Sequence, residues 1–233
     1  MLHEFKTKSH LYSNHTPQEN DNTEWLSLMQ HYGCPTRLLD FTDSPHIAAF
    51  FAASDSTGEA AIWALDWWTM RDNLHERFSL DCKIGKALRD EINLKHLEFA
   101  NKHIANQTLR TESPLSLIPI KPKKFTDRIA RQQGLFVMPT NAKKPFMANL
   151  AAAYGFPEAD NKTEKVEIEA LLARNFMDYN KDAKRYCAIK LLLPQMACEN
   201  ILNNLIQMNI TAETLFGGID GLAKSLVQKI IRT

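Results

Sequence analysis

The stretch that decides the fold of this chain is QHYGCPTRLLDFTDSPHIAAFFAAS, residues 30–54. Its first part mixes polar and apolar side chains without the period of a surface helix, and Gly33 and Pro35 force a turn. Pro45 then stands at the first position of a new helix, a place that proline favours. That helix is apolar nearly all round, so we expect it to be buried on more than one side.

Further strands and helices are predicted outward from this stretch. Upstream, Thr23 is the expected cap of a helix that begins at Glu24. Strands are expected within EAAIWALDWW (59–68), SLIPI (116–120), GLFVMP (134–139) and RYCAIKLLLP (185–194). The last is expected to be a buried central strand, and the apolar helix to pack against the last two. Helices are expected over 126–133, 164–176, 195–208 and 211–216, and from Asp220 onward.

The irregular mixture of helices and strands predicts an α+β fold rather than alternating βαβ units. We expect a single domain in which a mixed small sheet is packed by helices. Residues 1–22 form a polar N-terminal segment, and residues 23–233 form the main domain. Within that domain, residues 86–109 predict a helical insert that partly faces solvent.

Composition excludes several classes of protein. Of 233 residues, 44% are hydrophobic and 24% charged, which is ordinary globular usage and excludes global disorder. The formal net charge of +1 argues against a general nucleic-acid binder. No apolar run approaches the roughly 20 residues of a membrane helix, and the N-terminus lacks a signal-peptide core. The four cysteines have no CxxC spacing, so we expect free thiols, mostly buried, in a cytoplasmic protein.

Familiar catalytic motifs are missing from the chain. There is no HxxxH pair with a nearby acid, no EF-hand or zinc spacing, no Walker loop, no GxSxG and no GxGxxG. We therefore expect no metal, and the common hydrolases, NTPases and Rossmann enzymes lose support.

The polar residues of 30–44 have a structural and a functional interpretation. In the structural one, Arg37 pairs with Asp40 or a distant carboxylate, His31 bonds a backbone carbonyl, and Thr42 and Ser44 cap the next helix. In the functional one, these side chains converge beside the turn. So many costly polar groups next to an apolar helix exceed what packing requires, which favours a functional site.

The stretch QHYGCPTRLLDFTDSPHIAAFFAAS resembles the central signature of the FRG domain, with Phe41 in place of the customary Trp. Arg128-x-x-x-Gln132-x-Gly134-x-Phe136 resembles the second block of that family. The stretch from Lys190 through Leu215-Phe216 to Ala223 resembles its C-terminal ending. The Arg-Gly strand that gives the family its name lies upstream of the signature, and no Arg-Gly dipeptide occurs here. The resemblance is therefore to an N-terminally shortened member.

A second resemblance is to the ADP-ribosyltransferases. Thr42-x-Ser44, followed by Ala49-x-Phe51-Ala52 and the strand AAIWAL, is similar to their Ser-Thr-Ser strand and Phe-Ala helix. That resemblance implies a split sheet, NAD as cofactor, and a transferase or NAD glycohydrolase activity. Gln132 and Gln133 stand where the family has a Glu, and a glutamine cannot stabilise an oxocarbenium-like centre as a carboxylate does.

Two functions remain open. The first is an enzyme or enzyme-derived domain that binds NAD or a related nucleotide. It assigns catalytic roles to His31, Arg37, Asp40 and Gln132, and cofactor binding to Gln30, Tyr32, Thr36, Thr42 and Ser44. The second is a non-catalytic recognition module for an unknown protein partner, in which the same motif is a polar clamp. Either function is placed in a phage-defence or toxin-like system, and the oligomeric state is left open.

Overall fold

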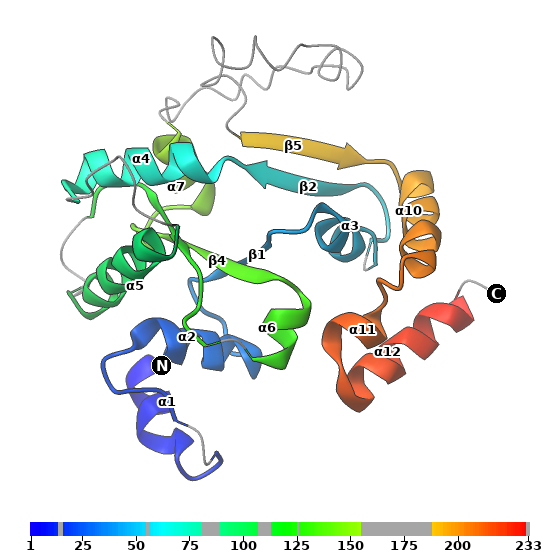
Figure 1. Ribbon diagram of the computed structural model, residues 1–233, viewed down its shortest axis with the longest axis horizontal. Helices are drawn as coiled ribbons and strands as arrows, with labels where there is room; N and C mark the ends of the chain where they lie inside the picture. The colour runs from blue at the N-terminus through cyan, green and yellow to red at the C-terminus, as the bar shows by residue number, and fades with distance from the viewer. Residues whose placement is uncertain are drawn as a thin grey trace.

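The computed structural model describes residues 1–13, 16–54, 56–80, 89–106, 113–124, 126–154 and 188–231 (Figure 1). Two small sheets form its centre. One has three strands in the order β1-β4-β3, and the other pairs β2 with β5. The predicted α+β fold is confirmed. The expected mixture of strand directions is not seen, because every described strand pair is antiparallel.

Strand β4 (Gly134–Pro139) lies at the centre of the larger sheet, between β1 (Leu39–Thr42) and β3 (Leu117–Ile120). Alternation of side chains gives β3 and β4 two buried faces. Ile118, Ile120, Phe136 and Met138 point to one core, whereas Leu117 and Val137 belong to another. Because both faces are covered, β4 is apolar along almost its whole length.

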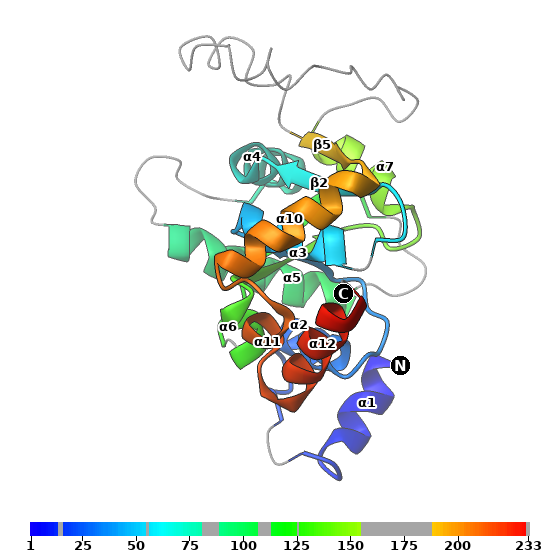
Figure 2. The same ribbon diagram turned by 90° about the vertical axis from the view of Figure 1, so that its right-hand side faces the viewer.

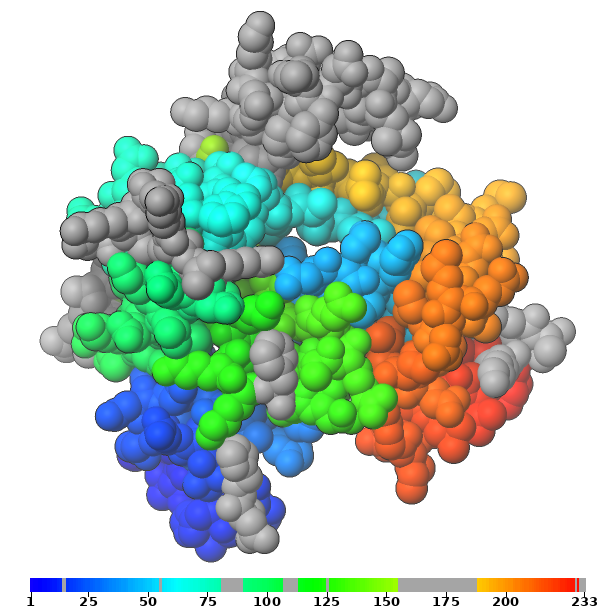
Figure 3. All heavy atoms as spheres, viewed as in Figure 1, coloured from blue at the N-terminus to red at the C-terminus, as the bar shows by residue number. Residues whose placement is uncertain are grey.

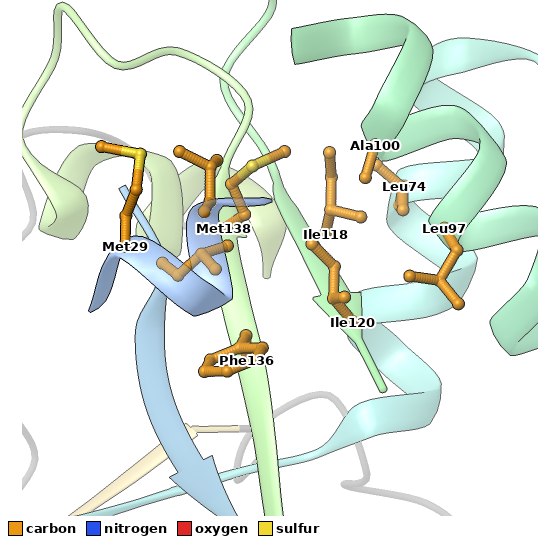
Figure 4. Close-up of a cluster of buried hydrophobic side chains, with 10 residues drawn as sticks. Met29, Leu74, Leu97, Ala100, Ile118, Ile120, Phe136 and Met138 are labelled. Atoms are coloured by element: carbon orange, nitrogen blue, oxygen red, sulfur yellow. The ribbon is translucent and has the colours of Figure 1, made fainter. Parts of the chain in front are cut away.

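The first core lies between the sheet and helices α2, α4 and α5 (Figure 4). Helix α5 (Arg89–Asn106) is the predicted insert. It contacts β3 and α2, and buries Leu97 and Ala100 against Leu74 of α4. This helix is therefore a wall of the main core, although its outer face is exposed as expected.

Helix α2 (Asn22–His31) begins earlier than the sequence pattern predicts. Its cap is Asp21, whose Oδ1 accepts a hydrogen bond from the Glu24 backbone N–H at 3.1 Å. Thr23 donates its hydroxyl to the same oxygen at 2.7 Å instead of capping the helix itself. A carboxylate at this position is the stronger cap because it also favours the positive end of the helix dipole. Helix α1 (Leu2–Ser9) packs against α2.

The smaller sheet differs from its prediction in two ways. Strand β2 ends at Leu65, because Asp66 caps helix α4 (Trp67–Phe78) and accepts from the Thr69 N–H at 2.9 Å. The two tryptophans expected in the strand are therefore helical. Strand β5 (Ala188–Leu193) pairs with β2 (Ala60–Leu65) in a two-stranded sheet, and Leu192 is 55% exposed. It is not a buried central strand.

Helix α3 (Pro45–Ser54) is buried mainly by another helix. Ile47, Phe50 and Ala53 share a core with Leu202 and Leu205 of α10 (Gln195–Gln207), which crosses α3 in Figure 2. The expected packing on GLFVMP is not found, and only Leu193 of β5 adjoins this core. Phe51 is 36% exposed, so α3 is not buried all round.

The remaining described helices are α6 (Asp127–Arg131), α7 (Phe146–Ala153), α11 (Ala212–Phe216) and α12 (Gly218–Ile231). Helix α7 covers the second core of the main sheet. Helix α12 begins at Gly218 rather than after an Asp220 cap. The helix predicted over 164–176 lies outside the described residues.

Two histidines form a buried pair between α4 and α5. His75 Nε2 and His96 Nε2 are 2.9 Å apart, and one hydrogen between them satisfies both nitrogens. Burial lowers the pKa of His96 to about 3, with a further contribution from His75. Burial also lowers the pKa of His75, helped by the charge of Arg71. Both rings are therefore neutral in the folded protein at physiological pH.

This pair predicts acid sensitivity. The unfolded chain protonates both histidines near pH 6.5, whereas the folded protein resists protonation, so the unfolded state binds more protons. The free energy of unfolding should fall as pH drops below about 6.5, by about 1.4 kcal/mol per pH unit for each proton. Urea titrations between pH 7 and 4 measure this slope. His96→Leu should flatten it, and His46→Gln on the exposed start of α3 is the matched control.

The two adjacent phenylalanines of α3 should differ in cost. Phe50→Ala should lower the free energy of unfolding by about 3–5 kcal/mol, because Phe50 is only 2% exposed. Phe51→Ala should cost about 1–2 kcal/mol, because part of its ring already contacts water. Denaturant titrations of the two variants give the comparison. Equal losses would contradict this orientation of α3.

Candidate functional site

The three sequence blocks meet beside β1, in a cluster that we call the three-block junction: Gln30, Asp40, Thr42, Arg128, Gln132 and Phe216. Strand pairing creates it, because Thr42 lies opposite Gly134 at the start of β4, directly after α6. Thr42 Oγ1 donates to the Gln132 carbonyl at 2.8 Å, and Gln132 Nε2 donates to the Leu215 carbonyl at 3.3 Å. In Figure 3, α6 and the α11–α12 pair adjoin on one face of the molecule.

Gln30, at the end of α2, links the turn to β1. Its Nε2 donates to Asp40 Oδ1 at 2.8 Å, and its Oε1 accepts a hydrogen bond from the Thr36 hydroxyl. The same Thr36 hydroxyl accepts from the Leu38 backbone N–H at 3.1 Å. Both ends of the Gln30 amide are therefore engaged within the protein.

Asp40 carries a perturbed carboxyl group. Burial raises its pKa above the ordinary value, while the Gln30 hydrogen bond and the charge of Arg128 pull the pKa down. The residue nevertheless keeps an exposed side. A carboxyl that is partly desolvated yet reachable from solvent, with an arginine nearby, is the kind of group that functional sites use.

Arg37 does not pair with Asp40. Within the described residues no ion pair joins Arg37 to Asp40, and the charge that acts on Asp40 is that of Arg128. Burial lowers the pKa of Arg37, and the charge of Arg37 contributes to the lowered pKa of His103 on α5. Arg37 lies in the bend before β1, whereas Asp40 belongs to the strand itself.

His31 and Tyr32 also lie away from the junction. Gly33 has φ of +81°, a conformation that glycine adopts without strain, and its N–H donates to the Gln30 carbonyl at 3.0 Å to end α2. The two rings are exposed and meet edge to face at 5.0 Å. Tyr32 instead lines an apolar pocket of about 420 Å³ between α1 and α2, together with Phe5 and Leu28.

Ser44 has a structural position. Its backbone N–H donates to Thr42 Oγ1 at 3.1 Å, and its Oγ accepts from the Ile47 N–H at 3.4 Å. Ser44 thus caps α3, as the structural interpretation predicts. The Thr42 hydroxyl thus holds the Ser44 backbone in place and also links β1 to the end of α6.

Arg128, Phe216 and Lys224 are site residues that sequence reasoning missed. The Arg128 guanidinium carbon lies 4.6 Å from the centroid of the Phe216 ring, and Lys224 Nζ lies 4.0 Å from it. Phe51 contacts the same ring edge to face at 5.9 Å. Arg128 and Phe216 lie within the sequence blocks that resemble the FRG family. An assumption that these blocks meet in space could therefore have predicted both residues.

The fold and site define an α+β protein organised around a polar signature on β1. Residues 1–60 match the family model of the FRG domain, which covers α1 to the start of β2 and includes the whole 30–54 stretch. No curated protein and no solved structure matched the chain. The FRG resemblance thus has support over this segment, whereas nothing in the comparisons supports the resemblance to ADP-ribosyltransferases.

Two structural features are absent from the described part of the chain. No helix there is both long enough and apolar enough to cross a membrane. No group of three or more His, Cys, Asp or Glu residues gathers there in a way that could hold a metal ion. Cys34 and Cys198 are free thiols, the former half-buried and the latter buried, while Cys82 and Cys187 lie outside the described residues.

The Thr42 hydroxyl should be a measurable source of stability. Thr42→Val keeps the shape and β-propensity but removes the bonds to the Gln132 carbonyl and the Ser44 N–H. We expect the free energy of unfolding to fall by about 1–2 kcal/mol. Thr57→Val, in an exposed turn, should change it by less than about 0.5 kcal/mol. Urea titration compares the two, and similar losses would mean that the Thr42 bonds add nothing.

Proposed function

We propose that this chain is a recognition module in which the FRG signature is a polar clamp rather than a catalytic centre. The observation that carries this proposal is that the candidate side chains satisfy one another. Gln30 joins Thr36 to Asp40, and Thr42 joins Gln132 to the cap of α3. A group that must break an internal hydrogen bond before it can hold a ligand is a poor binding group.

The placement of the other candidates agrees with a clamp. If all the predicted residues bound one nucleotide, their side chains would have to line a single pocket. Tyr32 lines the pocket between α1 and α2. The charge of Arg37 instead helps to lower the pKa of His103 on α5, and Gln132 donates a hydrogen bond to the Leu215 carbonyl. The clamp thereby ties α2, α6 and α11 to β1, and it holds the surrounding surface in one shape for a partner.

A second candidate function rests on Asp40 alone. Its raised pKa and its neighbour Arg128 suit an acid or base that acts on NAD or a related nucleotide. This function keeps the enzyme interpretation, either as ADP-ribosyltransferase or as NAD glycohydrolase. A phage-defence or toxin-like setting fits either function and rests on the family resemblance.

A double-mutant cycle tests the clamp. Gln30→Ala and Asp40→Ala, alone and together, should show a coupling energy of about 0.5–1.5 kcal/mol in the free energy of unfolding. The matched cycle, Arg37→Ala with Asp40→Ala, should show coupling near zero, because the charge that acts on Asp40 comes from Arg128. A larger coupling in the Arg37 cycle would contradict the assignment.

Incubation with NAD separates the two functions. If the signature is a clamp, the purified chain should release no nicotinamide above the spontaneous rate. If Asp40 is catalytic, release should be measurable and should disappear in Asp40→Asn, while a melting curve shows that the variant remains folded. Chromatographic detection of nicotinamide decides between these results, and release that depends on Asp40 would overturn the recognition proposal.

A further inference from the structure

Two cationic side chains from different helices share one aromatic ring at the edge of the three-block junction. Arg128 belongs to α6 and Lys224 to α12, and both lie over Phe216. Within the described residues, neither side chain takes part in an ion pair. Asp40 partly offsets the charge of Arg128, but that carboxylate is also engaged by Gln30.

Among the described residues, two other cations that lie over aromatic rings, Lys6 and Arg71, have a carboxylate partner, whereas Lys190 over Trp63 has none. Lys6 lies 5.7 Å from the Trp25 ring, and its Nζ is 3.6 Å from Glu19 Oε1. Arg71 lies 4.5 Å from the Trp68 ring and is paired with Asp72. At Phe216 the second group is instead another cation. Because like charges repel, two cations at one ring favour a bound anion that offsets their charge.

We propose that Arg128 and Lys224 form a binding site for a phosphoryl group, as a phosphomonoester or a pyrophosphate. A guanidinium offers a planar fork of donors and an ammonium a compact charge, and together they suit an anion with several oxygens. The Phe216 ring positions both cations and keeps water from one side of each. This inference rests on the proposed recognition function, since it names the chemistry of what the module holds.

Binding at this site would not break the hydrogen bonds of the polar clamp. The clamp residues Gln30, Thr42 and Gln132 keep their internal hydrogen bonds, while the two cations have no such commitment. Helices α6 and α12 are far apart in the sequence. Helix α11 contacts both of them and so links them in space. A phosphoryl group on this site would therefore contact both α6 and α12.

Titration calorimetry with inorganic pyrophosphate at low ionic strength tests the site in the full chain. The wild type should bind, and Lys224→Gln and Arg128→Gln should each weaken binding about tenfold or more. Lys224 is exposed, so its variant should fold normally even if Arg128→Gln loses stability through Asp40. The matched control is Lys190→Gln, which removes an exposed lysine 5.7 Å from the Trp63 ring and should weaken binding less than about twofold.

Absence of pyrophosphate binding by the wild type would overturn the proposal, as would equal weakening in the control. A parallel titration with ADP identifies the source of the phosphoryl group. Tighter binding of ADP means that the nucleoside adds contacts, and equal binding means that the phosphoryl group alone is recognised. Nicotinamide release from NAD is measured separately, so failure of the clamp function and failure of this site give different results.

Discussion

The antiparallel pairing of β1 with β4 is the contact on which the rest of the structure depends. It joins segments about 90 residues apart and sets Thr42 opposite Gly134. The same register brings the Asp43 N–H to the Gln133 carbonyl at 3.1 Å, so the end of β1 is held to the end of α6. Without this pairing, neither the link from Thr42 to Gln132 nor the position of Arg128 near Asp40 would exist.

The sheet can support such a site because its apolar residues are buried on both faces. Met138 and Ile118 face α2, α4 and α5, and Val137 faces α7 on the other side. This burial supplies the driving force for the fold. The hydrogen bonds of the polar clamp then fix the arrangement of the elements at the edge of the sheet. The polar residues of β1 therefore lie where a rigid core ends and the surface begins.

The proposed function rests on which polar side chains already have hydrogen-bond partners within the protein. Gln30, Thr42 and Gln132 have internal partners, and they define the shape of the junction. Arg128 and Lys224 share the Phe216 ring, and they are the residues of the proposed phosphoryl site. A structural motif and a binding surface can thus stand side by side, and a dense polar signature does not by itself locate the group that touches a ligand.

Local features of the sequence were enough to predict much of the secondary structure. The turn at Gly33, the start of α3 at Pro45 and the strand GLFVMP depend on residues close in sequence, and all three are found. The Ser44 cap belongs to the same class, because its hydrogen bond spans three residues. Backbone preference and short-range capping favour such features, and here they agree with the tertiary fold.

Tertiary structure alone decided which partner each side chain meets. On α12, Leu222 and Leu226 are apolar residues one helical turn apart, yet they are 43% and 49% exposed. Helix α12 instead approaches α11 through Gly221, where an added Cβ would lie 3.0 Å from the Ala212 carbonyl oxygen. In the same way, Asp40 meets Arg128 rather than Arg37 because strand pairing brings α6 to β1. The periodicity of the sequence shows which face of a helix is apolar. Contacts between distant segments determine which face is buried and which charged groups become neighbours.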